Sequence, residues 1–157
     1  MPDMLVKLYE LPDLEPSLTA MRERGIIVRH AMPYEVERVV AWVRAHWGDG
    51  WAAECSVTFA RHPVTCFIAL DEGKLCGFGC YEATSPDFFG PTGVEESYRK
   101  RGIGKALLMA CLHSLKELGY GYAIIGGAGP VDFYAKAAGA TVIEGSSPGV
   151  YRDGIRG

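Results

Sequence analysis

No apolar stretch of this 157-residue chain reaches the roughly 18 to 20 residues that a membrane-spanning helix requires. The N-terminal sequence MPDMLVKLYELPDLEP also lacks a basic segment followed by a continuous apolar one, which is the pattern of a secretory leader. We therefore expect a cytoplasmic protein that does not interact with a membrane.

An excess of basic charge is also absent. The chain has 16 Lys and Arg residues against 19 Asp and Glu residues, which gives a formal net charge of −3. This balance provides no general attraction to nucleic acid or to an anionic lipid surface. We expect neither as a partner, so any basic cluster must act locally.

Paired cysteines are missing. The five cysteines form no Cys-x-x-Cys pair, and each lies among apolar residues: Cys55, Cys66, Cys76, Cys80 and Cys111. Small buried thiols have this setting. We expect no metal site and no disulfide.

Internal repeats, low-complexity tracts and linkers are absent too, so one domain should use residues 1–157. Hydrophobic periodicity predicts helices over residues 13–24, 33–47, 102–118 and 131–139, and strands over 26–30, 65–70, 75–83, 88–94 and 120–125. Residues 46–63 show no clean period. Because strand, helix and strand follow one another over 88–125, those two strands should be parallel within an α/β (α+β) fold.

The most informative segment is YRKRGIGK, residues 98–105, which holds four cations and no acid where a strand passes into a helix. A helix N-terminus offers unpaired N–H groups and a partial positive charge, and glycines let an anion approach the backbone. This combination predicts a phosphate site. Its spacing excludes a Walker loop, since Ala106 follows Lys105, and a dinucleotide fingerprint, since Leu107 stands where a small residue is needed.

The spacing Arg-x-x-Gly-x-Gly, formed by Arg99, Gly102 and Gly104, is followed at residues 132–140 by DFYAKAAGA. Together these motifs resemble the coenzyme A pyrophosphate loop and the later tyrosine helix of the GNAT superfamily of N-acetyltransferases. The resemblance covers residues 88–143 closely and residues 26–83 in the order of elements. It implies a mixed, mostly antiparallel sheet of about six to seven strands with helices on both faces. Residues 1–25 then form an N-terminal extension, which either extends the sheet or reaches a partner subunit.

The resemblance also implies a set of site residues. The backbone of Val94 would face a thioester, Phe133 would pack near the cofactor, and Tyr134 would be the general acid. The pyrophosphate cradle would consist of Arg99, Lys100, Arg101, Gly102, Ile103, Gly104 and Lys105.

The implied chemistry asks for two proton carriers. When an amine attacks acetyl-CoA, a hydroxyl such as that of Tyr134 can protonate the leaving thiolate, and nearby cations would lower the pKa of that tyrosine. A base must first deprotonate the ammonium. Glu82, at the end of a central strand, is the candidate base. Its rivals are Glu54, His46 and His62.

The sequence departs from the family pattern at Gly126-Gly127-Ala128-Gly129-Pro130, where family members often carry an asparagine that bonds pantetheine. The glycines could admit a bulkier acceptor or cofactor arm, because they have no side chain. The missing asparagine also keeps open a non-catalytic module that binds or senses acyl-CoA.

The function implied is therefore an acetyl-CoA-dependent N-acetyltransferase that acts by direct attack in a ternary complex. Transfer of a different acyl group is a further alternative. The acceptor is a small-molecule or peptide amine, and among the tryptophans Trp47 and Trp51 are the candidates for its pocket. A homodimer is left open, and two-fold symmetry would be its usual form.

Overall fold

The computed structural model describes residues 1–156 and contains one seven-stranded sheet in the order β2-β3-β4-β5-β6-β1-β7. The strands are β1 (Met4–Lys7), β2 (Ile26–His30), β3 (Cys66–Asp71), β4 (Lys74–Tyr81), β5 (Phe88–Val94), β6 (Tyr122–Ile125) and β7 (Thr141–Val142). The helices are α1 (Glu15–Glu23), α2 (Val36–Trp47), α3 (Asp49–Val57), α4 (Ile103–Glu117) and α5 (Val131–Ala138).

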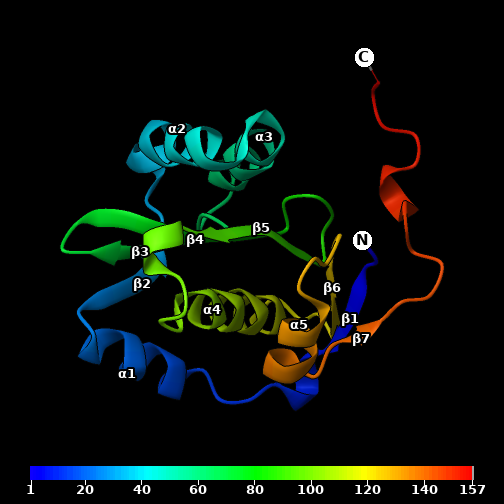
Figure 1. Cartoon of the computed structure of the whole chain (residues 1–157), viewed down its shortest axis with the longest axis horizontal. Coiled ribbons are helices and arrows are strands. Elements are labelled where there is room, and N and C mark those ends of the chain that lie inside the picture. The colour runs from blue at the N-terminus through cyan, green and yellow to red at the C-terminus, as the bar shows by residue number, and fades with distance from the viewer. Residues whose placement is uncertain (157) are drawn as a thin grey trace.

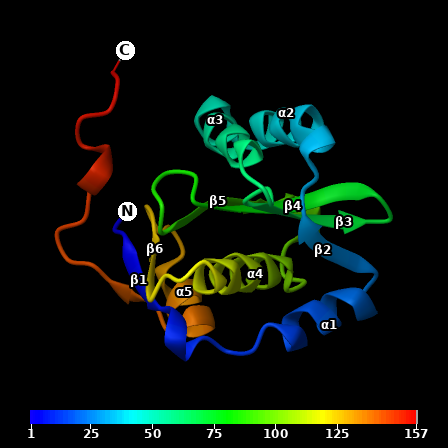
Figure 2. The ribbon, with the colours of Figure 1, turned by 180° about the vertical axis from the view of Figure 1, so that it is seen from behind.

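Helices cover both faces of this sheet, as the sequence predicted. Helices α2 and α3 lie on one face, and α1, α4 and α5 lie on the other (Figures 1 and 2). Neighbouring strands pair antiparallel, with the exception of β5 and β6, which pair in parallel as the strand-helix-strand pattern required. Within the described residues, no helix has the length and apolar character that crossing a membrane requires.

Helix α4 lies at the centre of the layer that is formed by α1, α4 and α5. It begins after Gly102, whose φ of +87° lies in the left-handed region that glycine adopts without strain. Its stripe of Leu107, Cys111 and Leu115 is completely buried. Each leucine removed from water in this way contributes about 1.5 to 3 kcal/mol to folding. This packing fixes where the N-terminus of α4 lies relative to β5.

The layer that is formed by α2 and α3 contains a helix that the hydrophobic periodicity of the sequence did not reveal. Residues 46–63 gave no clean pattern, yet α3 occupies Asp49–Val57 and follows α2 after a turn at Gly48. The reason is that α3 has nine residues and buries only Ala52 and Cys55. A short helix with two small buried residues leaves almost no periodic signal.

The N-terminal extension adds a strand to the sheet, which is the first of the two roles expected for residues 1–25. Strand β1 lies between β6 and β7 and pairs antiparallel with both. The buried carboxylate of Asp3 accepts a 2.8 Å hydrogen bond from the backbone N–H of Gly127. The first residues therefore fix the glycine-rich loop that follows β6.

Candidate active site

Strands β5 and β6 diverge after a short region of contact. They pair only at Phe88 with Ile124 and at Phe89 with Ile125. Beyond these pairs, β5 continues against β4 alone, and Gly77 is the partner of Val94. One edge of residues 90–94 therefore has no strand beside it. The irregular strand FFGPTGV also shifts register against β4, as its glycines and proline predicted.

This divergence opens a cavity of about 900 Å³. One wall, which we call the strand wall, consists of residues 90–94, the N-terminal end of α4, and Phe133 and Tyr134 of α5. The opposite wall, which we call the helix wall, is formed by Trp47, Trp51, Glu54, Thr84 and Tyr151. The strand wall includes Val94, Arg99 and Gly104, so the cavity reaches the basic loop.

The N–H group of Val94 faces the open edge of β5. The next N–H, that of Glu95, donates a 2.9 Å hydrogen bond to the carbonyl of Cys76 on β4. Successive N–H groups of a strand point to opposite sides, so that of Val94 points away from β4 and toward the divergence. An extended ligand lying along β5 could pair with it as a neighbouring strand would.

The N-terminus of α4 presents a run of free amides. No acceptor among residues 1–156 pairs with the backbone N–H groups of residues 100–105. These groups carry the positive end of the helix dipole, which favours an anion. Gly104 lies on the cavity, and its backbone is not shielded by a side chain. The loop is thus open to a phosphate-bearing ligand.

The basic side chains of this loop are fixed by nearby groups. Arg99 donates from Nε to the carbonyl of Val94 at 3.3 Å, and Arg101 stacks over the ring of Tyr98 at 4.9 Å. Arg24, which directly follows α1, donates to the carbonyl of Arg101. Arg24 was not singled out in the sequence, because nothing in the local pattern joins residue 24 to residue 101. The predicted cradle residues that do not line the cavity are Lys100, Arg101, Gly102, Ile103 and Lys105.

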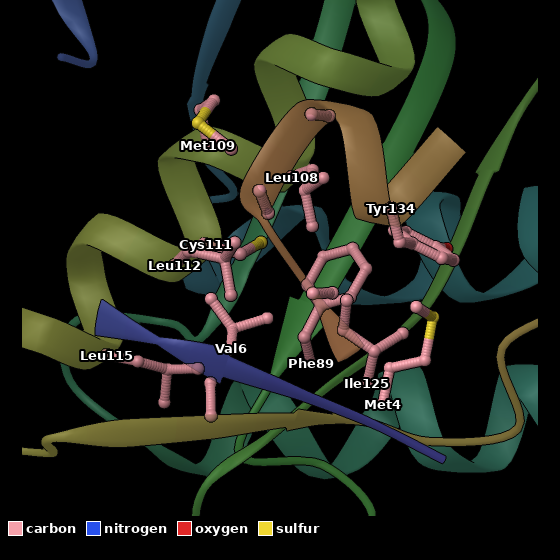
Figure 3. Packing of buried hydrophobic residues seen from close by; sticks show 14 of the residues in the cluster. Met4, Val6, Phe89, Leu108, Met109, Cys111, Leu112, Leu115, Ile125 and Tyr134 are labelled. Atoms are coloured by element: carbon pink, nitrogen blue, oxygen red, sulfur yellow. The ribbon is translucent and has the colours of Figure 1, made fainter. Parts of the chain in front are cut away.

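Tyr134 lies in the strand wall beside Phe89 and Ile125 (Figure 3). Its ring meets that of Phe89 edge-on at 6.2 Å. Burial raises the pKa of Tyr134 to about 12. This corrects the expectation that nearby cations would lower it, because the cations of the loop lie outside its immediate surroundings. The hydroxyl therefore stays protonated throughout the physiological pH range.

Glu82 and Tyr134 are not brought together. Glu82 does not line the cavity; its carboxylate instead forms a 3.5 Å ion pair with Arg61 and accepts a hydrogen bond from Tyr120. The two histidine rivals also lie outside the cavity lining. Of the residues considered as a base, only Glu54 faces the cavity, and Trp47 and Trp51 lie beside it as predicted.

The glycine-rich loop after β6 does not leave free space at Gly126. A Cβ there would come within 2.9 Å of both the Phe88 ring and the Tyr151 hydroxyl. The space at Gly126 is thus filled by this chain itself, whereas a Cβ at Gly127 would meet nothing within 4 Å and Gly127 lines the cavity, so room for a bulky acceptor or cofactor arm beside this loop stays a prediction. The missing side chain at Gly126 lets Tyr151, from the C-terminal segment, approach the end of β6.

Three of the five cysteines gather away from the cavity. The sulfur atoms of Cys55, Cys66 and Cys80 all lie within 4.8 Å of one another and are completely buried. Burial raises the pKa of the Cys80 and Cys111 thiols well above its usual range. All five side chains are buried, as predicted, and the expectation that they hold no metal stays a prediction.

Sequence comparison identifies the family to which this geometry corresponds. The model of the acetyltransferase (GNAT) family matches residues 27–140, which is more than half of the chain. The chain belongs to the GNAT acetyltransferase family. The matched region runs from β2 to the end of α5 and so includes the divergent strands, the α4 loop and Tyr134. No curated protein matches this GNAT chain.

Solved structures share the GNAT fold at low identity. A glucosamine N-acetyltransferase region in a fungal multi-domain GH3 β-N-acetylglucosaminidase has a TM-score of 0.74 at 14% identity, over 90% of this chain and 19% of that chain. A GCN5-related N-acetyltransferase from Sphaerobacter thermophilus has a TM-score of 0.64 at 20% identity, over 90% of this chain and 48% of that one. An aminoglycoside acetyltransferase from an uncultured soil sample, in complex with trehalose, has a TM-score of 0.51 at 18% identity, over 73% and 84%. This GNAT chain thus spans half or less of the first two proteins.

Proposed function

We propose that residues 1–157 form one domain that transfers an acetyl group from acetyl-CoA directly to an amine in a ternary complex. The observation that carries this proposal is the divergence of β5 from β6, which puts the unpaired N–H of Val94 and the hydroxyl of Tyr134 on one cavity. The family supports acetyl transfer in general. The acetyl donor and the amine acceptor are our proposal.

The residues present fit the proposed cosubstrate at two points. Its pyrophosphate would meet the free amides of residues 100–105, with Arg99 and Lys100 adding charge. Its extended pantetheine arm would lie along the open edge of β5 and bond to backbone groups of residues 90–94. The asparagine that often bonds pantetheine in this family is absent, so these backbone groups would carry the binding.

Two groups of the strand wall would act on the reacting atoms. The N–H of Val94 would stabilise the oxyanion that forms when the amine attacks the thioester, and Phe133 would pack against the bound arm. Tyr134 would protonate the leaving thiolate. Its pKa of about 12, against about 8.5 for a thiol, makes that transfer uphill by about 5 kcal/mol. A turnover of about 10 per second corresponds to a barrier of about 16 kcal/mol, which accommodates this step.

We do not propose Glu82 as the general base. Its carboxylate is paired with Arg61, whereas deprotonating an ammonium requires a free carboxylate in contact with the acceptor. Glu54 is the one candidate base that lines the cavity.

Thermal unfolding with acetyl-CoA, CoA and ATP added separately tests this proposal. At 100 times Kd, a ligand that binds only the folded state adds about 2.7 kcal/mol of stability. We expect acetyl-CoA and CoA to raise Tm and ATP to leave it unchanged. Absence of any shift with either coenzyme contradicts the proposal. Binding without thiol release over a broad amine panel would instead favour the non-catalytic acyl-CoA module.

A further inference from the structure

The helix wall collects side chains from distant parts of the sequence. Trp51 and Glu54 come from α3, Thr84 from the connection between β4 and β5, and Tyr151 from a short 3-10 turn near the C-terminus. All four line the cavity opposite the strand wall. In the proposed placement, the cofactor's phosphates and arm would leave this part of the cavity free.

Glu54 is a half-buried carboxylate without a counter-charge. One of its oxygens accepts a hydrogen bond from the Thr84 hydroxyl, and no cation of residues 1–156 forms an ion pair with it. By contrast, Glu82 pairs with Arg61. A carboxylate facing an apolar cavity is stabilised by a positively charged ligand, so Glu54 presents an acceptor with a binding point.

Aromatic side chains line the cavity together with that carboxylate. The rings of Trp47 and Trp51 lie 5.8 Å apart at an angle of 30°, and Trp51 is 37% exposed. Tyr151 lines the cavity together with Glu54, and burial and the charge of Glu54 both raise the pKa of Tyr151. Aromatic faces bind ammonium groups and also pack against apolar bodies.

The other charged groups that line the cavity restrict the chemical class of the acceptor further. The charged side chains of the cavity are Glu54 and Arg99, and Arg99 lies at the loop end, bonded to the carbonyl of Val94. Met1 also lines the cavity, and its α-ammonium group donates to Ser147 Oγ at 3.4 Å and keeps its positive charge. A second ammonium on the acceptor would find no second carboxylate among the residues that line the cavity.

We propose that Trp51, Glu54 and Tyr151 form the acceptor subsite, and that the acceptor is a monoamine with an apolar or aromatic body. This inference rests on the proposed function. Its chemistry is one ammonium charge held by one carboxylate between aromatic faces.

The proton balance follows from the positions of Glu54 and Tyr134. Glu54 takes one proton from the ammonium, the neutral nitrogen forms a bond to the thioester carbonyl carbon, and the C–S bond breaks. The thiolate takes the proton of Tyr134, and the second proton of the nitrogen returns to Tyr134. Glu54 then releases its proton to water, so each amide formed releases one proton.

An acceptor panel tests the predicted chemistry. Thiol release from acetyl-CoA would be measured with phenethylamine and spermidine. We expect kcat/KM for phenethylamine to exceed that for spermidine by at least about tenfold, because a buried unpaired charge opposes binding. Faster turnover of spermidine overturns the inference while leaving acetyl transfer intact. Absence of turnover with phenethylamine also overturns it.

A second experiment tests the residues. We expect Glu54→Gln to lower kcat/KM for phenethylamine by about 100-fold, since both the counter-charge and the base are lost. The Kd for acetyl-CoA, measured by calorimetry, should change by less than about twofold. The exposed Glu23→Gln of α1 is the matched control and should behave as wild type. Unchanged kcat/KM in Glu54→Gln overturns the assignment.

Substitution of Tyr151 should have a different kinetic effect. Tyr151→Leu should raise KM for phenethylamine by about tenfold and change kcat by less than about threefold, because the ring binds the acceptor without exchanging protons. A fall in kcat with unchanged KM would overturn this role. Failure of the proposed function has a different result: wild-type protein would then not bind acetyl-CoA, or would bind it and release no thiol with any amine of the broad panel.

Discussion

The two walls of the cavity are built by different means. The strand wall consists of backbone groups and of side chains from one stretch of chain, residues 90–134, where β5, α4, β6 and α5 follow in order. The helix wall consists of side chains, contributed by α2, α3, the β4–β5 connection and the C-terminal segment. Only tertiary packing brings these segments together.

The difference corresponds to what each wall would bind. A cosubstrate of fixed structure can be held by backbone amides and a helix N-terminus, which many sequences can provide. An acceptor must be distinguished from other amines by charge and shape, and only side chains supply these. We expect substitutions in the strand wall to change acetyl transfer as such, and those in the helix wall to change the choice of amine.

The largest effect expected in the strand wall is on Tyr134. Tyr134→Phe should lower kcat by about 10- to 100-fold and leave acetyl-CoA affinity nearly unchanged, because the ring remains and the acidic proton is lost. Steady-state thiol release and calorimetry measure the two quantities. The exposed Tyr34→Phe is the control. A wild-type rate in Tyr134→Phe would remove this tyrosine from the mechanism.

Gly93 is where the two walls touch. A Cβ at Gly93 would come within 2.4 Å of the Trp47 ring, so Gly93→Ala must displace that ring. We expect a loss of about 1 to 3 kcal/mol in the free energy of unfolding, as overpacking usually costs. Urea denaturation measures it. Gly50→Ala in α3 is the contrast, because its Cβ meets nothing within 4 Å. Equal stability of the two variants would show that the walls do not constrain each other.

The basic loop should contribute affinity and not rate. Arg99→Ala combined with Lys100→Ala should raise the Kd for CoA by about tenfold, while the free amides of the loop retain part of the binding. Calorimetry at two salt concentrations gives the affinity and its charge dependence. Arg22→Ala on α1, an exposed cation outside the cavity, serves as the reference. Equal affinity in the double variant contradicts the cradle.

The smallest effect concerns alkaline pH. Tyr134 has a pKa of about 12 in the folded state, raised by burial from 10.0. Above pH 10 the unfolded chain therefore loses this proton first, and stability falls as pH rises toward 12. Between pH 9.5 and 10.5, Tyr134 should lower the free energy of unfolding by about 0.7 kcal/mol. Tyr134→Phe should remove this part of the decline. Urea denaturation at the two pH values measures it; an undiminished decline would mean that the ring is not buried.

Much of the strand wall could be predicted from residue order. The spacing of Arg99, Gly102 and Gly104 before a leucine-rich helix located the phosphate loop, because a helix N-terminus is a local feature. The parallel pairing of β5 and β6 followed from the intervening helix. The divergence of these strands could not be predicted, because it depends on how α4 and α5 pack beneath the sheet.

No comparable pattern in the sequence indicated the residues of the helix wall. Glu54 was one of several candidate bases and Tyr151 was not considered, since the C-terminal segment reaches the cavity only through the folded chain. Glu82 was favoured for its place at a strand end, but its partner Arg61 comes from a different segment. The missing period over residues 46–63 hid α3, whose buried side chains are too few and too small.

The sequence by itself determined most of the elements, the helix N-terminus that would take a phosphate and the family, because each depends on spacings within a short stretch of chain. The tertiary structure alone decided which carboxylate faces the cavity, how strongly Tyr134 holds its proton and what fills the space at Gly126. These properties depend on burial and on partners far away in the sequence, and such contacts exist only once the chain has folded.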